Sequence, residues 1–210
     1  LALNVSKSAY KDFVQPAITL NTGINSFEKY NQQLVTACIN DSTTDSTLAT
    51  RIQEIHLKTG KLVKDLQMEK ATLIALIDNI PEKEAEAISK DHYKLHNIFN
   101  FDIPTARLNG MNGSGKDGDG YAIQLQIEEY RNMLLDAVDD PAEAAFISNL
   151  LSTTEVNDID AGVKVPWVQY YFYKIPDLGV MNTLSGLEYR ILLAESSIIS
   201  HLTEVQKETK

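Results

Sequence analysis

The sequence predicts an all-α fold, an elongated antiparallel helical bundle with long helices, a glycine-rich loop and a short aromatic extended segment. Three observations support this fold class. Hydrophobic residues recur at steps of three and four through most of the chain. Glycine and proline rarely interrupt these stretches outside one loop. Strand-forming residues dominate only in the segment 163–173.

The C-terminal segment, residues 176–210, carries the most regular pattern. Pro176 suits the first turn of a helix because its missing N–H would have no intrahelical partner there. Such a helix is about 45–50 Å long at 1.5 Å rise per residue, so it predicts a rod rather than a compact globule. The residues expected to form its buried stripe are Val180, Leu184, Leu187, Ile191, Ala194, Ile198, Leu202 and Val205.

A first long helix is expected over residues 7–39. Pro16 and Gly23 strain this helix without ending it. Residues 40–46 are Asn, Asp, Ser and Thr throughout, which is the composition of a turn.

A second long helix follows the turn, with Asp45 or Ser46 as its N-cap. Pro81 limits it to about 33 residues. Its apolar residues occupy heptad a and d positions, with Thr59 and Glu69 as polar substitutions in that seam. Two rods joined by a short turn predict an antiparallel helical hairpin.

The segments between the second and the last helix are shorter. Residues 109–120 contain five glycines, which predicts a long exposed loop. Asp119 is the expected cap of a third helix, and Pro141 opens a fourth that runs through Leu151. Residues 163–173 are expected to be extended, with their five aromatic rings packed within the chain against the end of the bundle.

Composition excludes some classes of function. The net charge of −10 and the pI near 4.8 argue against nucleic acid as a partner, because phosphate binding needs clustered Lys and Arg. The single cysteine, Cys38, allows no internal disulfide and is expected to be a buried thiol. No run reaches the ~18 apolar residues of a membrane span. Residues 1–6 are interpreted as the tail end of a truncated membrane helix or its junction, and residues 7–210 as a single domain.

Residues 110–117 repeat the spacing of a phosphate-binding loop. Asp117, however, stands where Ser or Thr must reach magnesium, and its carboxylate would repel the phosphates. The residues before Gly110 also lack the apolar strand that this motif needs. We therefore interpret the segment as a flexible polar loop.

The same loop partly matches a calcium-binding loop. Asp117, Asp119 and Glu128 fall at its positions 1, 3 and 12, but Ala122 replaces the required glycine. His92 and His96 lie one helical turn apart, but no third zinc ligand is spaced to help them. The sequence therefore predicts no catalytic residues, no cofactor-binding residues and no metal ligands, and we do not expect an enzyme.

Three segments resemble the GldM/PorM family. Residues 1–7, followed by Phe13, resemble the junction at which the single membrane helix of that family leaves the inner membrane. Residues 120–123, leading to the pair Tyr130-Arg131, resemble its middle helix.

The third segment lies near the C-terminus. Residues 172–176 and the following Leu184, Glu195 and Leu202 are similar to the pattern of aromatic residues, proline and a long helix with an internal glutamate in that family.

The resemblance implies a periplasmic, membrane-proximal helical domain of the motor for gliding motility and type IX protein secretion. The family's membrane helix pairs with a GldL/PorL-like inner-membrane protein, and the complex uses the proton motive force. This domain would then be a non-enzymatic, homodimeric shaft that transmits motion from the inner membrane. It would be anchored by an N-terminal helix absent from this chain, and further C-terminal domains, also absent, would contact outer-membrane-associated secretion components. The energy-coupling residues of the family lie in the membrane helix, so none carries over to residues 1–210.

The alternative is an extracytoplasmic ligand-sensing helical bundle of a membrane receptor. It would need a polar-lined pocket between helices and a second membrane helix after Lys210.

Overall fold

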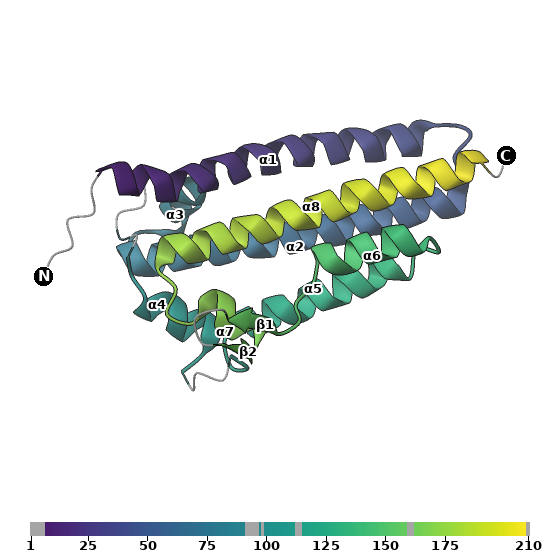
Figure 1. Ribbon diagram of the computed structural model, residues 1–210. Helices are drawn as coiled ribbons and strands as arrows, with labels where there is room; N and C mark the ends of the chain where they lie inside the picture. The colour runs from purple at the N-terminus through teal and green to yellow at the C-terminus, as the bar shows by residue number, and fades with distance from the viewer. Residues whose placement is uncertain (1–6, 91–96, 98, 112–114, 159–161, 209–210) are drawn as a thin grey trace, which may run out of the picture.

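A computed structural model describes residues 7–90, 97, 99–111, 115–158 and 162–208. Its long helices lie side by side and make an elongated bundle (Figure 1). The expectations for residues 1–6, and for His92 and His96, fall outside the described residues. None of the described helices is long and apolar enough to cross a membrane.

The predicted all-α fold is confirmed. The elements in chain order are α1 (Lys7–Asn40), α2 (Ser46–Asp78), α3 (Glu82–Ser89), α4 (Asp102–Pro104), the π-helix η2 (Thr105–Asn109), α5 (Asp119–Leu135), α6 (Pro141–Leu150), β1 (Val156–Asp158), β2 (Val163–Val165), α7 (Trp167–Phe172) and α8 (Asp177–Glu208). The two short strands form an antiparallel pair that joins Val156 to Val165.

The hairpin of α1 and α2 is present as expected. α1 continues through Pro16. The side chain of Asp45 caps α2 by accepting a hydrogen bond from the backbone N–H of Thr47 at 2.8 Å. α2 ends before Pro81 because Asn79 adopts the left-handed conformation, with φ of 53°, which asparagine tolerates better than most residues.

Helix α8 lies in the middle of the bundle, with α1 on one side, α2 behind it and α6 below it (Figure 1). α2 runs antiparallel to both α1 and α8. α1 and α8 run in the same direction, since Asn31 of α1 contacts Glu195 of α8 and Cys38 contacts Thr203 further along. The antiparallel expectation therefore holds for two of these three pairs. As a result, the start of α1 and the end of α8 lie at opposite ends of the bundle.

The predicted stripe of α8 is buried as far as Ile198, whereas Val205 is 44% exposed. A second stripe on α8 is buried as well, because helices cover α8 on several sides. Its members are Leu178, Met181, Ser185, Glu188, Leu192, Glu195 and Ile199.

The prediction that residues 163–173 are extended is wrong over most of this segment. Only Val163–Val165 form a strand, and Trp167–Phe172 form a helix. The pairing of β1 with β2 stops at Val165, so the residues beyond it have no neighbouring strand and satisfy their backbone groups in a helical turn. Trp167 and Phe172 are buried within the chain, as expected, but Tyr170 and Tyr173 are 37% and 45% exposed.

The glycine-rich loop is less exposed than the sequence suggests. Gly110, Gly115 and Gly120 are buried, while residues 112–114 lie outside the described part. Gly118 lies directly against the backbone of Leu108, where an added Cβ would be 2.2 Å from the carbonyl oxygen. Glycine is required there for close approach of two backbone segments.

We expect Gly118→Ala to lower the free energy of unfolding by about 2 kcal/mol, because the backbone must move to admit a methyl group. Gly60→Ala is the matched control. Gly60 lies inside α2 with nothing within 4 Å of an added Cβ, so alanine should stabilise the helix by roughly 0.5–1 kcal/mol. Urea unfolding measures both changes, and equal midpoints for the two variants would contradict the packing described for Gly118.

Candidate functional site

Four polar side chains meet between α1, α2 and α8 in the middle of the bundle: Asn31, His56, Glu195 and Ser196. The Nδ2 of Asn31 donates to the Oε2 of Glu195 at 2.6 Å and to the carbonyl oxygen of Leu192 at 2.8 Å. The Oγ of Ser196 donates to the Oδ1 of Asn31 at 2.6 Å. Asn31 and Glu195 are each 1% exposed. Both polar atoms of the Asn31 side chain therefore have partners on α8.

His56 links α2 to this cluster. Its Nδ1 lies 2.6 Å from the Oε1 of Glu195, and its Nε2 lies 3.3 Å from the Oε1 of Gln32 on α1. The hydrogen bond with Glu195 raises the pKa of His56, although burial opposes this. The contact therefore stabilises the fold most below the unfolded pKa of histidine, and this contribution is lost as pH rises through the folded-state pKa.

A second buried cluster lies two turns away along α8. The Nζ of Lys70 lies 2.5 Å from the Oε1 of Glu188, and the two side chains are 3% and 1% exposed. Lys70 also donates to the Oγ of Ser185 at 3.1 Å. Burial raises the pKa of Glu188, and the charge of Lys70 opposes that shift. Gln67 connects this pair to α1, because its amide lies 3.4 Å from both Glu188 and Glu28.

The two polar positions in the α2 seam also have partners. The hydroxyl groups of Thr59 and Tyr130 lie 2.7 Å apart and join α2 to α5. Burial raises the pKa of Tyr130, so its hydroxyl stays protonated.

Glu69 forms an ion pair with Arg107, which also contacts Asp119 at 2.9 Å. Asp119 is therefore not the cap of α5, whose N-cap is Gly118.

Asp177, the first residue of α8, is 1% exposed. Burial, together with the nearby charge of Asp78, raises the pKa of Asp177 to about 7. An unfolded aspartate loses its proton near pH 4, so between pH 4 and 7 the folded state holds more protons than the unfolded state. The contribution of Asp177 to stability therefore falls as pH rises through this range.

We expect Asp177→Asn to remove this pH dependence. Relative to the original chain, the variant should gain about 4 kcal/mol of unfolding free energy between pH 4 and pH 8, because its amide never ionises and each pKa unit corresponds to about 1.4 kcal/mol. Urea unfolding across this pH range gives the difference, and Asp102→Asn, an exposed aspartate, is the control. Parallel pH profiles for the original chain and Asp177→Asn would show that Asp177 is not buried as a protonated acid.

The motifs considered in the sequence lie apart from these clusters. A π-helix rather than a strand precedes Gly110. Asp119 and Glu128 both lie within α5, so they cannot wrap around an ion as a calcium loop does. Cys38 is buried between α1 and α8, with its Sγ 3.4 Å from the Oγ1 of Thr203. Within the described residues, no group of three or more His, Cys, Asp or Glu is placed to hold a metal ion.

The two buried clusters were not predicted as sites. In the sequence, Glu195 stands out only through the resemblance of the C-terminal segment to the GldM/PorM family. The signal that reveals them is the second stripe of α8, in which Ser185, Glu188 and Glu195 occur at the steps of three and four that otherwise carry apolar residues.

These contacts fix the helices along their length. Sliding α1 or α2 past α8 by one turn, about 5.4 Å, would leave buried polar groups without partners. The fold and these clusters thus define a helical structural domain whose long helices have one preferred register.

The sequence matches the family model described as the GldM N-terminal domain over residues 11–205. The chain therefore belongs to the GldM/PorM family, whose members are structural components of the motor for gliding motility and type IX secretion. No curated protein matches the chain.

Proposed function

We propose that residues 7–210 form a single non-enzymatic periplasmic shaft and dimerisation domain of a motor driven by the proton motive force. The domain transmits motion from the inner membrane, where an N-terminal helix anchors the protein and contacts a GldL/PorL-like partner. Domains that follow it contact outer-membrane-associated secretion components. Membership of the GldM/PorM family supports this assignment.

The observation that carries the proposal is the parallel arrangement of α1 and α8. The start of α1 and the end of α8 lie at opposite ends of the bundle (Figure 1). Buried polar contacts hold the two helices in register near their middle, at Asn31 and Glu195. A displacement applied at the start of α1 is thus transmitted to α8. It reaches the end of α8 at the opposite end of the bundle, because close-packed helices compress little.

Gliding cells that carry the full-length protein test this role. We expect Asn31→Ala to lower gliding speed and type IX secretion, because it removes the contacts of α1 with Glu195 and Ser196. Gln33→Ala, an exposed substitution on the same helix, is the control. Immunoblots must show equal amounts of both proteins. The Asn31→Ala variant should also unfold more easily, which shows that the contact is lost. Normal gliding with this destabilised variant would contradict transmission through the contact of Asn31 with Glu195.

The dimerisation part is tested separately. Sedimentation of the isolated domain should show a dimer whose fraction rises with concentration. A monomer at all concentrations would contradict dimerisation through this domain and leave the test in gliding cells unaffected.

A further inference from the structure

One long surface of the bundle is formed by α1, α8 and α6. In Figure 1, α8 lies between the other two helices, and no described helix lies in front of it. A partly exposed row of α8 runs along this surface at steps of three and four, through Asn182, Gly186, Tyr189, Leu193, Ser197 and Ser200. This row, with Phe27 and Tyr30 of α1 and Phe146 of α6, is called the α1–α8 face.

Aromatic rings cover the line along which α1 meets α8. The ring centre of Phe27 lies 5.4 Å from that of Tyr189 and 6.5 Å from that of Tyr30. Tyr189 lies over Gly23, where an added Cβ would be 2.9 Å from a ring carbon. Tyr30 is 49% exposed. Aromatic side chains that remain exposed are enriched at protein–protein interfaces.

Helix α6 forms the other border of the α1–α8 face. The Oγ of Ser197 donates to the Oε1 of Glu143 at 2.6 Å. Phe146, one turn further along α6, is 40% exposed. Residues three apart lie on the same side of a helix, so Phe146 lies beside Glu143 at this border.

The part of α1 on this face carries no charge. Over residues 15–40, the charged residues of α1 are Glu28 and Lys29. Glu28 contacts Gln67 of α2, so it lies on the other side of α1. Lys29 is two positions before Asn31, whose side chain contacts α8. Two positions correspond to about 200° around a helix, so Lys29 points away from α8.

Helix α8 adds little charge to the face. Over residues 178–200 its charged residues are Glu188, Arg190 and Glu195. Glu188 and Glu195 are each 1% exposed, which leaves Arg190 as the charged side chain near the surface. The α1–α8 face therefore combines exposed rings, a leucine and small polar residues with hardly any charge, a composition typical of an interaction site.

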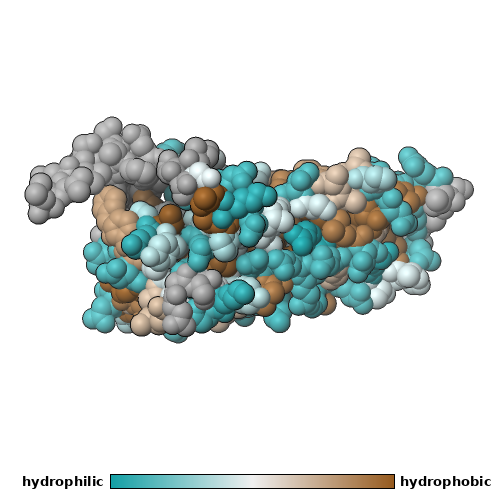
Figure 2. Space-filling view, turned by 60° about the horizontal axis from the view of Figure 1, so that its bottom comes forward, coloured by the Kyte–Doolittle hydropathy of each residue, from teal (hydrophilic) through white to brown (hydrophobic). Residues whose placement is uncertain are grey.

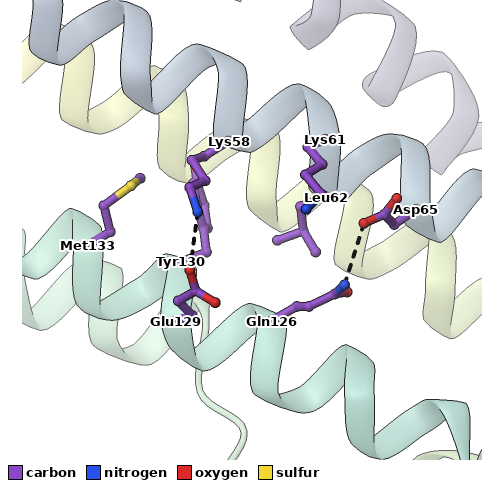
Figure 3. A pocket seen from close by; sticks show the side chains of 8 residues that line it. All are labelled: Lys58, Lys61, Leu62, Asp65, Gln126, Glu129, Tyr130 and Met133. Carbon is purple, nitrogen blue, oxygen red and sulfur yellow. Dashed lines mark hydrogen bonds and ion pairs between the residues drawn. The ribbon is translucent and has the colours of Figure 1, made fainter.

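Other sides of the bundle are different. Figure 3 shows Lys58, Lys61 and Glu129 around the hollow between α2 and α5. Figure 2 views the bundle from the side of α5 and α6, where hydrophobic patches are separated by hydrophilic side chains. The chain as a whole has a net charge of −10, so the α1–α8 face differs from these charged sides.

We propose that the α1–α8 face binds a second copy of the chain and forms the interface of the homodimer. Two copies with a net charge of −10 each repel one another, so they associate best through surfaces that carry little charge. A two-fold dimer also brings the same surface of both copies together, and clustered like charges there would oppose themselves. A basic partner, in contrast, would be recognised through acidic side chains, and this face has Glu143 only at its border.

The shape of the α8 row suits such a self-complementary contact. A Cβ added at Gly186 would meet no atom within 4 Å, so the row has a recess at this position. Tyr189 and Leu193 follow within two turns and stand out from the same row. In a two-fold arrangement the raised side chains of one copy can fill the recess of the other, as ridges pack into grooves between helices.

This inference rests on the dimerisation part of the proposed function, and substitution of Gly186 tests the face itself. Gly186→Trp places a large side chain on the face without meeting an atom of its own chain. Sedimentation of the domain should therefore show a dissociation constant of the dimer that is raised by about tenfold or more. Gly60→Trp is the matched control, because Gly60 also lies inside a long helix with nothing within 4 Å of an added Cβ, but outside the α1–α8 face. Its dimer should be unchanged.

A second pair of variants uses charge. Tyr30→Glu places an acidic side chain at the same position of both copies, so it should weaken the dimer, and added salt should restore part of the association because it screens this repulsion. Met68→Glu, at a residue of α2 that is 56% exposed, is the control and should leave the dimer unchanged. A purely structural defect of Tyr30→Glu would not show this dependence on salt. Should Gly186→Trp fail to fold, this pair decides the question.

Two results would overturn the proposal, and they differ in what they say about dimerisation. A dimer that Gly186→Trp and Tyr30→Glu weaken no more than their controls do has its interface elsewhere, which rejects the α1–α8 face and leaves dimerisation intact. A monomer at every protein concentration rejects both the face and the dimer.

Discussion

Lys70→Met should destabilise the domain by about 3–5 kcal/mol at pH 8, because it leaves Glu188 buried without its charged partner. Lys70 and Glu188 are 3% and 1% exposed, and their charged atoms lie 2.5 Å apart. Without Lys70, the burial that already raises the pKa of Glu188 acts unopposed, so this carboxyl group takes up a proton more readily. The loss of stability should therefore be smaller at pH 5 than at pH 8.

Two further variants separate this effect from the loss of a lysine side chain. Lys64→Met, an exposed substitution on the same helix, should change the unfolding free energy by less than about 0.5 kcal/mol. Lys70→Met combined with Glu188→Leu should recover most of the lost stability, because apolar side chains often replace a buried ion pair without cost. A double variant as unstable as Lys70→Met alone would contradict the explanation by an unpaired charge.

The sequence predicts the long helices well because their signals are local. Asp45 caps α2 through its own side chain, and Pro141 and the preceding Asp140 begin α6. Such hydrogen bonds depend on residues two or three positions apart, so they are visible in one sequence. Trp167–Phe172 shows the limit of this reasoning. Its conformation depends on where the pairing of β1 with β2 ends, and local residue propensity gives no information about that pairing.

The buried polar clusters could be predicted only in part. The second stripe of α8 places Glu188 and Glu195 on a buried face, but their partners Lys70 and Asn31 lie on helices more than a hundred residues away. Glutamate on a helix is usually solvated, so its pattern alone does not show that it is paired inside. The positions of α1 and α2 beside α8 decide these pairs, and they result from the path of the whole chain.

Trp167→Ala is expected to lower the unfolding free energy by about 3–5 kcal/mol, because truncation of a buried aromatic ring removes its contacts and leaves a cavity. Trp167 is 2% exposed, and its ring centre lies 5.3 Å from that of Tyr171 and 5.7 Å from that of Phe172. These contacts are within one chain. The loss should therefore be the same at every protein concentration, and the association state should not change.

Urea unfolding followed by circular dichroism measures this change without relying on the fluorescence of Trp167, the only tryptophan of the chain. Tyr170→Ala, three residues further along α7, is the control, since Tyr170 is 37% exposed. It should cost clearly less than Trp167→Ala. An unchanged midpoint for Trp167→Ala would show that α7 does not pack as described. A loss that disappears at high protein concentration would place Trp167 in a contact between chains instead.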